Sequence, residues 1–411
     1  MTNNDNNLRK KIVMSPQEKK YSLMLSTLFS LRMFGLFIIL PIFTLHAATL
    51  PDGNNLTLIG FALGAFGLLQ VFLQIPYGIA SDFFGRKKLI YIGLILFLLG
   101  SVVGIFADSV LQLTIARALQ GAGAFSGVVS AFAADLIIPK HLTKAMAMIG
   151  SSIALMFAIS LVAAPFLYGI ISLNGIFAIT AFLTLPAFLI TYFLPETGLH
   201  KNNKQNILYL IKFVLTNKNL CLLNLGILLL SFLQTSFFIS IPKLLQTALN
   251  LDLQQHWRVY LPAIFLSLIF MIPPIILAET KNKMALVFRS NILLLAIINI
   301  CLYLMLMFMQ ENLEFAFWKI TGLVFLFFVA FNVLEATLPS LVAKHSDINT
   351  KGTAMGFYNT SQSLGIFLGG FFGGYLAQNF GISYIFVAGL IVAILWLAIT
   401  FLAKQNFTSQ H

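Results

Sequence analysis

The chain has 411 residues, of which 59% are hydrophobic and only 9% are charged. Soluble domains typically carry about 25% charged residues, so this composition excludes a water-exposed surface over most of the molecule. The net charge is +12, but the basic residues are spread over short segments between apolar runs, which excludes a nucleic-acid-binding protein. Both cysteines, Cys221 and Cys301, lie in apolar runs, so we expect neither a disulfide framework nor a cysteine metal site.

Long apolar stretches run through the whole chain. A helix needs about 20 apolar residues to cross a hydrocarbon core of about 30 Å. We predict an all-α membrane protein of twelve such spans: 21–46, 56–80, 88–107, 110–136, 143–171, 175–194, 220–247, 257–279, 285–309, 315–342, 352–378 and 381–403. The predicted domains are a tail at 1–20, a six-helix bundle at 21–194, a linker at 195–219, a second six-helix bundle at 220–403 and a tail at 404–411.

The lysines and arginines predict the orientation of these spans. If the N-terminus is cytoplasmic, 20 of the 25 basic residues fall in cytoplasmic segments and three in outer ones. The other two, Arg32 and Arg117, fall within spans. This bias predicts that both termini are cytoplasmic, so the net charge indicates topology and not a partner.

The two halves resemble each other in sequence. Lys144–Met148 aligns with Lys351–Met355 at an offset of 207 residues, which also aligns Tyr168 with Tyr375. A repeat of six spans favours two bundles related by a pseudo-two-fold axis along the membrane normal. In transporters built this way, the substrate site lies near the midplane between the halves.

The most informative motif follows the second predicted span. A positive-inside loop explains its cations but neither Asp82 nor its glycines, which permit close approach and a tight reversal. The stretch resembles the loop signature of the major facilitator superfamily, although Phe83 stands where that family prefers a cation. The matching residues are Gly78, Asp82, Gly85, Arg86, Lys87 and Lys88.

Asp135 ends the fourth predicted span on the same side as this loop. One interpretation makes it the partner of Arg86, in a latch that closes the cytoplasmic side. The alternative is that it simply reaches water or pairs within its own loop.

Two arginines lie deep in the predicted N-terminal bundle. Arg117 opens the sequence Arg-Ala-Leu-Gln120-Gly, which resembles a superfamily motif in which the arginine is linked to proton coupling. Burying a cation in a membrane is costly, so Arg117 and Arg32 are expected to face the bundle interior or a water-filled cavity. Either acidic side chains or anionic substrates would then neutralise the positive charge of these two arginines. For Arg117 the alternative is a purely structural hydrogen-bonding centre.

Glu335 is the deepest acidic residue, about nine residues or roughly 13 Å inside Lys344. Because a low dielectric disfavours the charged carboxylate, Glu335 is the leading candidate for a proton carrier. The alternative is a fixed hydrogen-bonding role at the inner gate. Asn332 lies one turn earlier on the same helix face and joins either arrangement.

Helix-bending and small residues mark two further spans. Pro165 is expected to bend the fifth span. The glycines Gly365, Gly369 and Gly373 are expected to let the eleventh span pack closely and slide during gating. The antiporter motif of the superfamily is matched plainly only at Pro165. No Gly-x-x-x-x-Gly-Lys-(Ser/Thr) loop occurs, so ATP is not expected to drive this protein directly.

A closer resemblance runs through residues 20–403. The segments similar to those of YajR-type inner-membrane transporters are Leu31–Gly35, Lys144–Gly150, Phe331–Leu341, Lys351–Gly356 and Ser361–Gln362. The resemblance implies a proton-driven drug antiporter with Arg32, Arg117 and Glu335 at matching positions. It also implies that Asp82 meets the cytoplasmic end of the eleventh span, near Gly352 and Thr353.

We therefore expect a secondary active transporter that exports small molecules, amphipathic ones among them, by proton antiport and alternating access. An anion or metabolite porter or symporter that uses the buried arginines is the alternative, and a non-transporting membrane sensor or scaffold is a more distant one. An enzyme is not expected, nor is a cofactor or a metal. The expected partners are protons, a small-molecule substrate and the lipid of a bacterial inner membrane; nucleic acid is not expected, and the protein is expected to be a monomer.

Overall fold

The computed structural model describes residues 14–196, 207–280, 283–308, 313–346 and 350–402. In these ranges every regular element is a helix. In chain order they are α1 (Pro16–Phe37), α2 (Leu40–Ala47), α3 (Leu56–Phe84), α4 (Arg86–Ile105), α5 (Val110–Ala122), α6 (Ser126–Leu136), α7 (Pro139–Phe193), α8 (Ile207–Thr216), α9 (Lys218–Leu249), the short 3₁₀ helix η2 (Leu253–Gln255), α10 (Trp257–Phe270), α11 (Ile272–Thr280), α12 (Met284–Phe308), α13 (Leu313–Lys344), α14 (Lys351–Asn379) and α15 (Ser383–Leu402).

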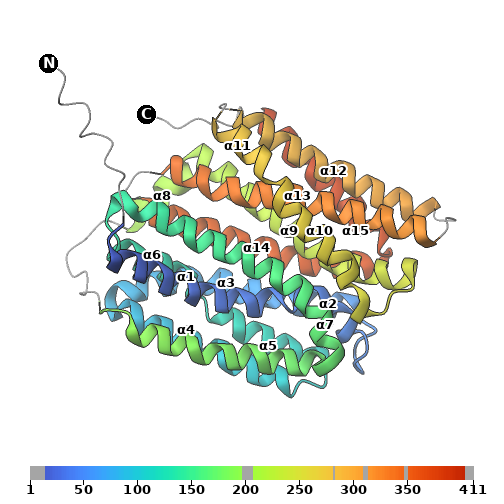
Figure 1. The fold of residues 1–411 in the computed structure, drawn as a ribbon, viewed down its shortest axis with the longest axis horizontal. Helices are drawn as coiled ribbons and strands as arrows, with labels where there is room; N and C mark the ends of the chain where they lie inside the picture. The colour runs from blue at the N-terminus through green and yellow to red at the C-terminus, as the bar shows by residue number, and fades with distance from the viewer. Residues whose placement is uncertain (1–13, 197–206, 281–282, 309–312, 347–349, 403–411) are drawn as a thin grey trace.

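The helices lie side by side along the long axis of the molecule (Figure 1). Those of the first half of the chain, α1 to α7, occupy the lower part of the view, and α9 to α13 occupy the upper part. We call the end at which α1 begins and α15 ends the terminal end, and the opposite end, where α2 ends and α3 begins, the distal end. The two halves meet most extensively where α3 packs against α14.

Nine helical segments in the described ranges are long and apolar enough to cross a membrane. The pair α5–α6 is not among them because the helix is interrupted between Ala122 and Ser126. Helix α14 is also not among them; its sequence is rich in glycine, serine and asparagine, as expected of a membrane helix that packs closely against its neighbours.

Helix α7 covers two of the predicted spans, 143–171 and 175–194. Its 55 residues correspond to about 80 Å of straight helix, far more than the thickness of a bilayer core. The backbone leaves the helical region at Ser172 (φ 56°, ψ −174°). This departure from helical geometry comes seven residues after Pro165, which lies inside the helix; the bend at Pro165 stays a prediction.

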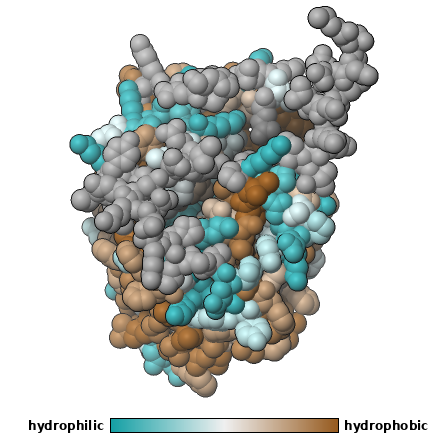
Figure 2. Space-filling view, turned by 90° about the vertical axis from the view of Figure 1, so that its left-hand side faces the viewer, coloured by the Kyte–Doolittle hydropathy of each residue, from teal (hydrophilic) through white to brown (hydrophobic). Residues whose placement is uncertain are grey.

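Burial separates the central helices from the outer ones. The most apolar windows of α1–α2 and α9 are mostly buried within the molecule, whereas those of α7, α10–α11 and α15 mostly expose their side chains. Exposed apolar side chains in such helices face lipid. Figure 2 looks onto the terminal end, where hydrophilic residues gather above a predominantly apolar lower surface.

Candidate functional site

The two halves are in backbone contact along one face of α3. Gly60, Gly64 and Gly67 lie directly against α14: a Cβ atom on Gly60 would overlap the Gly370 carbonyl oxygen, and one on Gly64 would lie 2.8 Å from the Phe367 carbonyl oxygen. Small residues permit this approach because nothing separates the two backbones. We call this contact the α3–α14 seam. It occupies the distal half of both helices.

Two further contacts strengthen the distal end of the seam. The backbone N–H of Leu56, at the start of α3, donates to Gln378 Oε1 of α14 at 2.7 Å. The ring of Phe61 on α3 meets the rings of Phe367 and Phe371 edge-on, with centroids 5.9 and 6.4 Å apart. Beside the Asn55 side-chain cap of α3, one more free N–H of this helix end is thus satisfied by the opposite half of the molecule.

The glycines expected to pack closely and slide during gating do pack closely, against a helix other than α3, and their sliding stays a prediction. Gly365, Gly369 and Gly373 all lie against α9, inside the second half of the molecule. Gly370 and Gly374 form the seam with α3. The reason is geometric: positions spaced by four share one helix face, and Gly370 is rotated by about 100° from Gly369.

An aromatic cluster joins the halves further inside. Phe157 of α7 contacts Phe238 of α9 and Phe328 and Phe331 of α13, with ring centroids between 5.7 and 6.4 Å apart. Phe37 of α1 packs edge-on against Phe157 at 5.0 Å. We call these five residues the aromatic plug. All except Phe37 are buried, so the plug and the seam together close the distal side.

The terminal end is open by comparison. A Cβ atom on Gly78 of α3, or on Gly352 or Gly356 of α14, would find no atom within 4 Å. The Asp82 side chain is 48% exposed. The same two helices that touch at the distal end are therefore apart at the terminal end, and the contact of Asp82 with Gly352 and Thr353 implied by the resemblance is not formed in this conformation.

The loop motif forms a charged cluster within the first half. Arg86 donates from Nε to Asp135 Oδ2 at 2.9 Å, and its Nη1 lies 2.5 Å from both Asp82 Oδ1 and Ser81 Oγ. The Arg86 and Asp135 side chains are about nine-tenths buried, so their ion pair is more strongly held than an exposed one. The pairing of Arg86 with Asp135 is thus the one expected from the sequence.

Backbone geometry and one lysine complete the loop. Gly85 has φ 94°, a conformation open to glycine, and forms the junction between α3 and α4. Lys87 Nζ donates to the carbonyl oxygens of Tyr192 and Leu194 at 2.9 and 2.8 Å, which satisfies acceptors at the C-terminal end of α7. Lys88 is exposed.

The two deep arginines share one aromatic ring. The guanidinium carbons of Arg32 and Arg117 lie 5.6 and 4.8 Å from the centroid of Phe66, within the range of a cation–π interaction. Arg32 donates to Ser126 Oγ and also lies over Phe125. Neither arginine lines the open side, because Arg32 is 3% exposed and Arg117 has no exposed surface.

Arg117 is the centre of a hydrogen-bonding network. It donates to Gln120 Oε1 at 2.9 Å; Gln120 donates to Ser101 Oγ at 3.0 Å, and Thr180 Oγ1 lies 3.2 Å from the same hydroxyl. This arrangement is the structural centre that the sequence left open as an alternative. Nevertheless Nε and Nη2 of both arginines lack a hydrogen-bond partner, and no carboxylate of the described residues lies within salt-bridge distance of Arg32 or Arg117.

Glu335 is held between two helices of the second half. Its Oε1 accepts a hydrogen bond from Gln362 Nε2 of α14 at 3.0 Å, and its Oε2 is buried without a partner. The side chain retains partial exposure. Asn332 does not join Glu335, since its Nδ2 donates to Ser267 Oγ of α10 at 3.1 Å. Glu335 therefore faces α14 while Asn332 faces α10.

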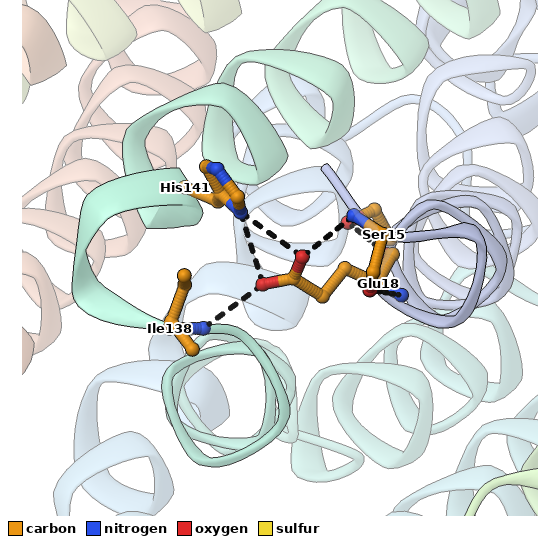
Figure 3. Close-up of polar contacts among 5 residues, drawn as sticks. Ser15, Glu18, Ile138 and His141 are labelled. Carbon is orange, nitrogen blue, oxygen red and sulfur yellow. Dashed lines mark hydrogen bonds and ion pairs between the residues drawn. The ribbon is translucent and has the colours of Figure 1, made fainter. Parts of the chain in front are cut away.

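A second carboxylate ties the start of α1 to the start of α7 (Figure 3). Glu18 caps its own helix through Ser15, accepts from the backbone N–H of Ile138 at 3.3 Å, and lies 3.0 Å from His141 Nδ1. His141 is buried. In the sequence this histidine falls between two predicted spans, so only the folded contact reveals this link.

One cavity of the structure lies apart from these residues. It has a volume of about 680 Å³ and lies between α11, α12 and α13. Leu286 and Ile297 line it and are largely exposed on the outside of the bundle. It is an apolar groove on the membrane-facing surface. Within the described ranges, no group of three histidine, cysteine or acidic residues is arranged to hold a metal ion.

The sequence family of this chain agrees with that architecture. The family model described as Major Facilitator Superfamily matches residues 24–370. The chain belongs to this superfamily. It is 38% identical over 395 residues, covering 95% of this chain and 85% of the relative, to the inner membrane transport protein YajR of Escherichia coli (strain K12). An uncharacterized transporter of Buchnera aphidicola subsp. Schizaphis graminum is 36% identical, with 94% and 98% covered.

Solved structures of the superfamily share the fold. The POT family transporter PepTSo superposes with a TM-score of 0.72 at 14% identity, covering 95% of this chain and 99% of that one. A bacterial homologue of the human lysosomal transporter Spinster, in an inward-facing and occupied conformation, gives 0.71 at 14% identity, with 96% and 98% covered. The protein is therefore a multi-pass membrane transporter of the superfamily and not an enzyme.

Sequence reasoning missed several residues that this geometry brings forward. Gly60, Gly64 and Gly67 carry a signal, since their spacing of four and three residues places small side chains on one helix face. Phe157 carries none, because aromatic side chains occur throughout these helices and its partners are distant in the sequence. Gln362 belongs to a segment that carries the family resemblance, but the sequence gives it no partner or role.

Proposed function

We propose that this transporter exports small molecules, amphipathic ones among them, by proton antiport across a bacterial inner membrane. The environment of Glu335 carries the proposal. Its carboxyl group lies in the interior and accepts a hydrogen bond from a neutral amide, and no lysine, arginine or histidine of the described residues is within salt-bridge distance. Without a fixed cation, a proton is the natural neutralising partner of a carboxylate in a low dielectric.

The proposed topology has twelve spans with both termini in the cytoplasm. The nine apolar segments supply ten when α7 is divided at Ser172, and α5–α6 and α14 supply the other two. The terminal end is then cytoplasmic, in keeping with the bias of basic residues. On this basis the structure is an inward-open state, with the α3–α14 seam and the aromatic plug closing the outer side.

Alternating access would exchange these contacts for others. In the outward-open state the seam parts and the cytoplasmic ends of α3 and α14 approach each other. Asp82, held beside Arg86, is placed to meet the start of α14 in that state, as the resemblance implies. The ion pair of Arg86 with Asp135 keeps the loop in position meanwhile. Gln362 then moves with α14, while its partner Glu335 is carried by α13 beside it.

The experiment is dye efflux from proteoliposomes with an imposed pH gradient. Glu335→Gln is expected to abolish the dependence of efflux on the gradient, because the amide carries no exchangeable charge. Asp82→Asn is expected to slow efflux while leaving its dependence on the gradient. Asp108→Asn is the matched control, since Asp108 is exposed in a loop at the distal end. Efflux by Glu335→Gln that still responds to the gradient as the wild type does would refute the proposal.

A second function, transport of an organic anion, is favoured by one specific observation. Arg32 and Arg117 carry two buried positive charges that no carboxylate of the described chain answers, and a buried charge without a partner is unfavourable. Uptake of a labelled carboxylate into proteoliposomes, with and without a pH gradient, distinguishes this function from drug efflux. Arg32→Gln is expected to abolish such uptake if the anion answers that charge.

A further inference from the structure

We propose that Gln362 is the positioning residue that ties the protonation state of Glu335 to the α3–α14 seam. The inference rests on the proton-coupled function proposed above and adds a residue that connects the proton site to the moving contact. It begins from a juxtaposition on α14. Gln362 bonds to Glu335 of α13, and the next residue, Ser363, lies under Gly67 of α3.

Helix α14 therefore presents three different faces to three helices. Gln362 points toward α13, the Ser363 and Phe367 backbone toward α3, and Gly365 toward α9. Because successive residues are rotated by about 100° around the helix, these contacts are rigidly linked by the helix itself. A displacement of α14 relative to α13 at Gln362 is transmitted to the seam without any flexible segment between them.

Glu335 has few polar neighbours besides Gln362, so this residue affects both the charged and the protonated form of the carboxyl group. The buried Oε2 atom has no partner. On α14, Tyr358 lies one turn before Gln362, and its buried hydroxyl also lacks a hydrogen-bond partner. Ser267 of α10 is already occupied by Asn332.

Among the described residues, no charged group on the other helices packed against α13 forms an ion pair with Glu335. Arg289 of α12 donates to the Thr400 carbonyl oxygen of α15 and lies over Phe401. The remaining basic residues at the neighbouring helices α9, α10, α12 and α14 lie at or near helix ends, namely Lys218, Lys243, Arg258, Lys283 and Lys351. The amide of Gln362 is thus the direct polar contact between the carboxyl group and α14.

An amide suits both protonation states. Gln362 donates from Nε2 to a carboxylate, and after rotation about its last torsion it offers Oε1 to the O–H of the protonated acid. A charged carboxylate with one neutral donor is poorly solvated in the interior, which favours the conformation in which water reaches it. The neutral acid is satisfied by Gln362 alone and is compatible with closure of the cytoplasmic end. Gln362 keeps α14 attached to the group whose charge changes.

The test measures conformation as a function of pH. Spin labels are placed at Phe84 and Gly352, at the cytoplasmic ends of α3 and α14, in a protein whose native cysteines Cys221 and Cys301 are replaced by serine. Distance distributions are recorded in mildly acidic and mildly alkaline buffer. Gln362→Met keeps the approximate volume and removes the amide. Thr360→Val is the matched control, because the Thr360 hydroxyl bonds back to its own helix at Gly356.

Wild-type protein and Thr360→Val are expected to shift toward the closed cytoplasmic end at acidic pH. The pH response is the closed-to-open population ratio in the acidic buffer divided by the same ratio in the alkaline buffer. Glu335→Gln should lose this response. Gln362→Met should lower it at least about fivefold, a typical size for coupling between sites. A residue with a merely structural role would lower thermal stability and leave the pH response intact.

Two results separate the possible failures. If Glu335→Gln responds to pH as the wild type does, the proton-coupled function fails and the inference falls with it. If Glu335→Gln loses the response while Gln362→Met retains it, Gln362 has no coupling role although the proton site stands. Should Gln362→Met not fold, Gln362→Leu also removes the amide, and an undiminished response in that variant overturns the inference equally.

Discussion

The α3–α14 seam gives the sharpest prediction of this structure, through the substitution Gly60→Ala. The added Cβ atom would overlap the Gly370 carbonyl oxygen and lie 2.8 Å from the Gly374 Cα atom. Non-bonded carbon atoms have their optimum at about 3.5–4.0 Å, so the two helices must separate by about 1 Å. Both obstacles belong to the backbone, which cannot rotate aside as a side chain would.

The cost falls on one conformation. Overpacking of a tight contact typically costs about 1–3 kcal/mol, and here it applies only where α3 and α14 touch. If the seam parts in the outward-open state, Gly60→Ala should shift the balance toward that state by roughly 5–150-fold, the ratio that corresponds to this free energy. Gly78→Ala is the matched control on the same helix, because a Cβ atom there meets nothing within 4 Å.

Spin labels at Asn54 and Asn379 report the distal ends of α3 and α14 in a protein without native cysteines. Both residues are exposed. Gly60→Ala is expected to lengthen the distance between them and to enlarge the population with a separated outer side, while Gly78→Ala matches the unsubstituted protein. Identical distributions for the two alanine variants would refute the reasoning, because the seam would then tolerate a methyl group that its backbone spacing excludes.

Three further substitutions test other contacts. Asp135→Asn removes the buried carboxylate that pairs with Arg86 and should cost about 1–3 kcal/mol of stability. Asp82→Asn should cost less, because its exposed pair is worth about 0–1 kcal/mol. Thermal unfolding in detergent measures both. Glu18→Gln should lower the unfolding temperature by weakening the link to His141, whereas a solvated glutamate would show no change. Phe157→Ala removes the ring that joins the halves and should increase labelling of single cysteines in the plug from the outer side; unchanged labelling would contradict its sealing role.

Much of the site is accessible from the sequence because burial in a membrane is costly. A charge placed inside a long apolar run must have a special environment, which is why the amino-acid sequence alone singles out Arg32, Arg117 and Glu335. Arg86 and Asp135 pair as their positions at neighbouring helix ends predict, and the ion pair is present. The loop glycine Gly85 permits the expected reversal through a positive φ.

The sequence does not predict the direction in which these side chains point. The sequence predicts that Arg32 and Arg117 face an interior or a cavity, and it is the packing of Phe66 that places both guanidinium groups in a closed interior. The glycines of α14 illustrate the same limit. Gly369 and Gly370 are neighbours in the chain, yet one contacts α9 and the other contacts α3, since the rotation of a helix about its axis is decided by all of its neighbours together.

The amino-acid sequence determined that this is a membrane transporter made of long helices, because apolar length and the placement of basic residues follow directly from the thickness and polarity of a bilayer. The tertiary structure decided which end is closed and which residues close it. Those contacts join positions about 80 to 320 residues apart, such as Phe157 with Phe238 and Leu56 with Gln378. In the proposed transport cycle they belong to one of several conformations. A sequence does not state which of them is populated, because their free energies differ by only a few weak contacts.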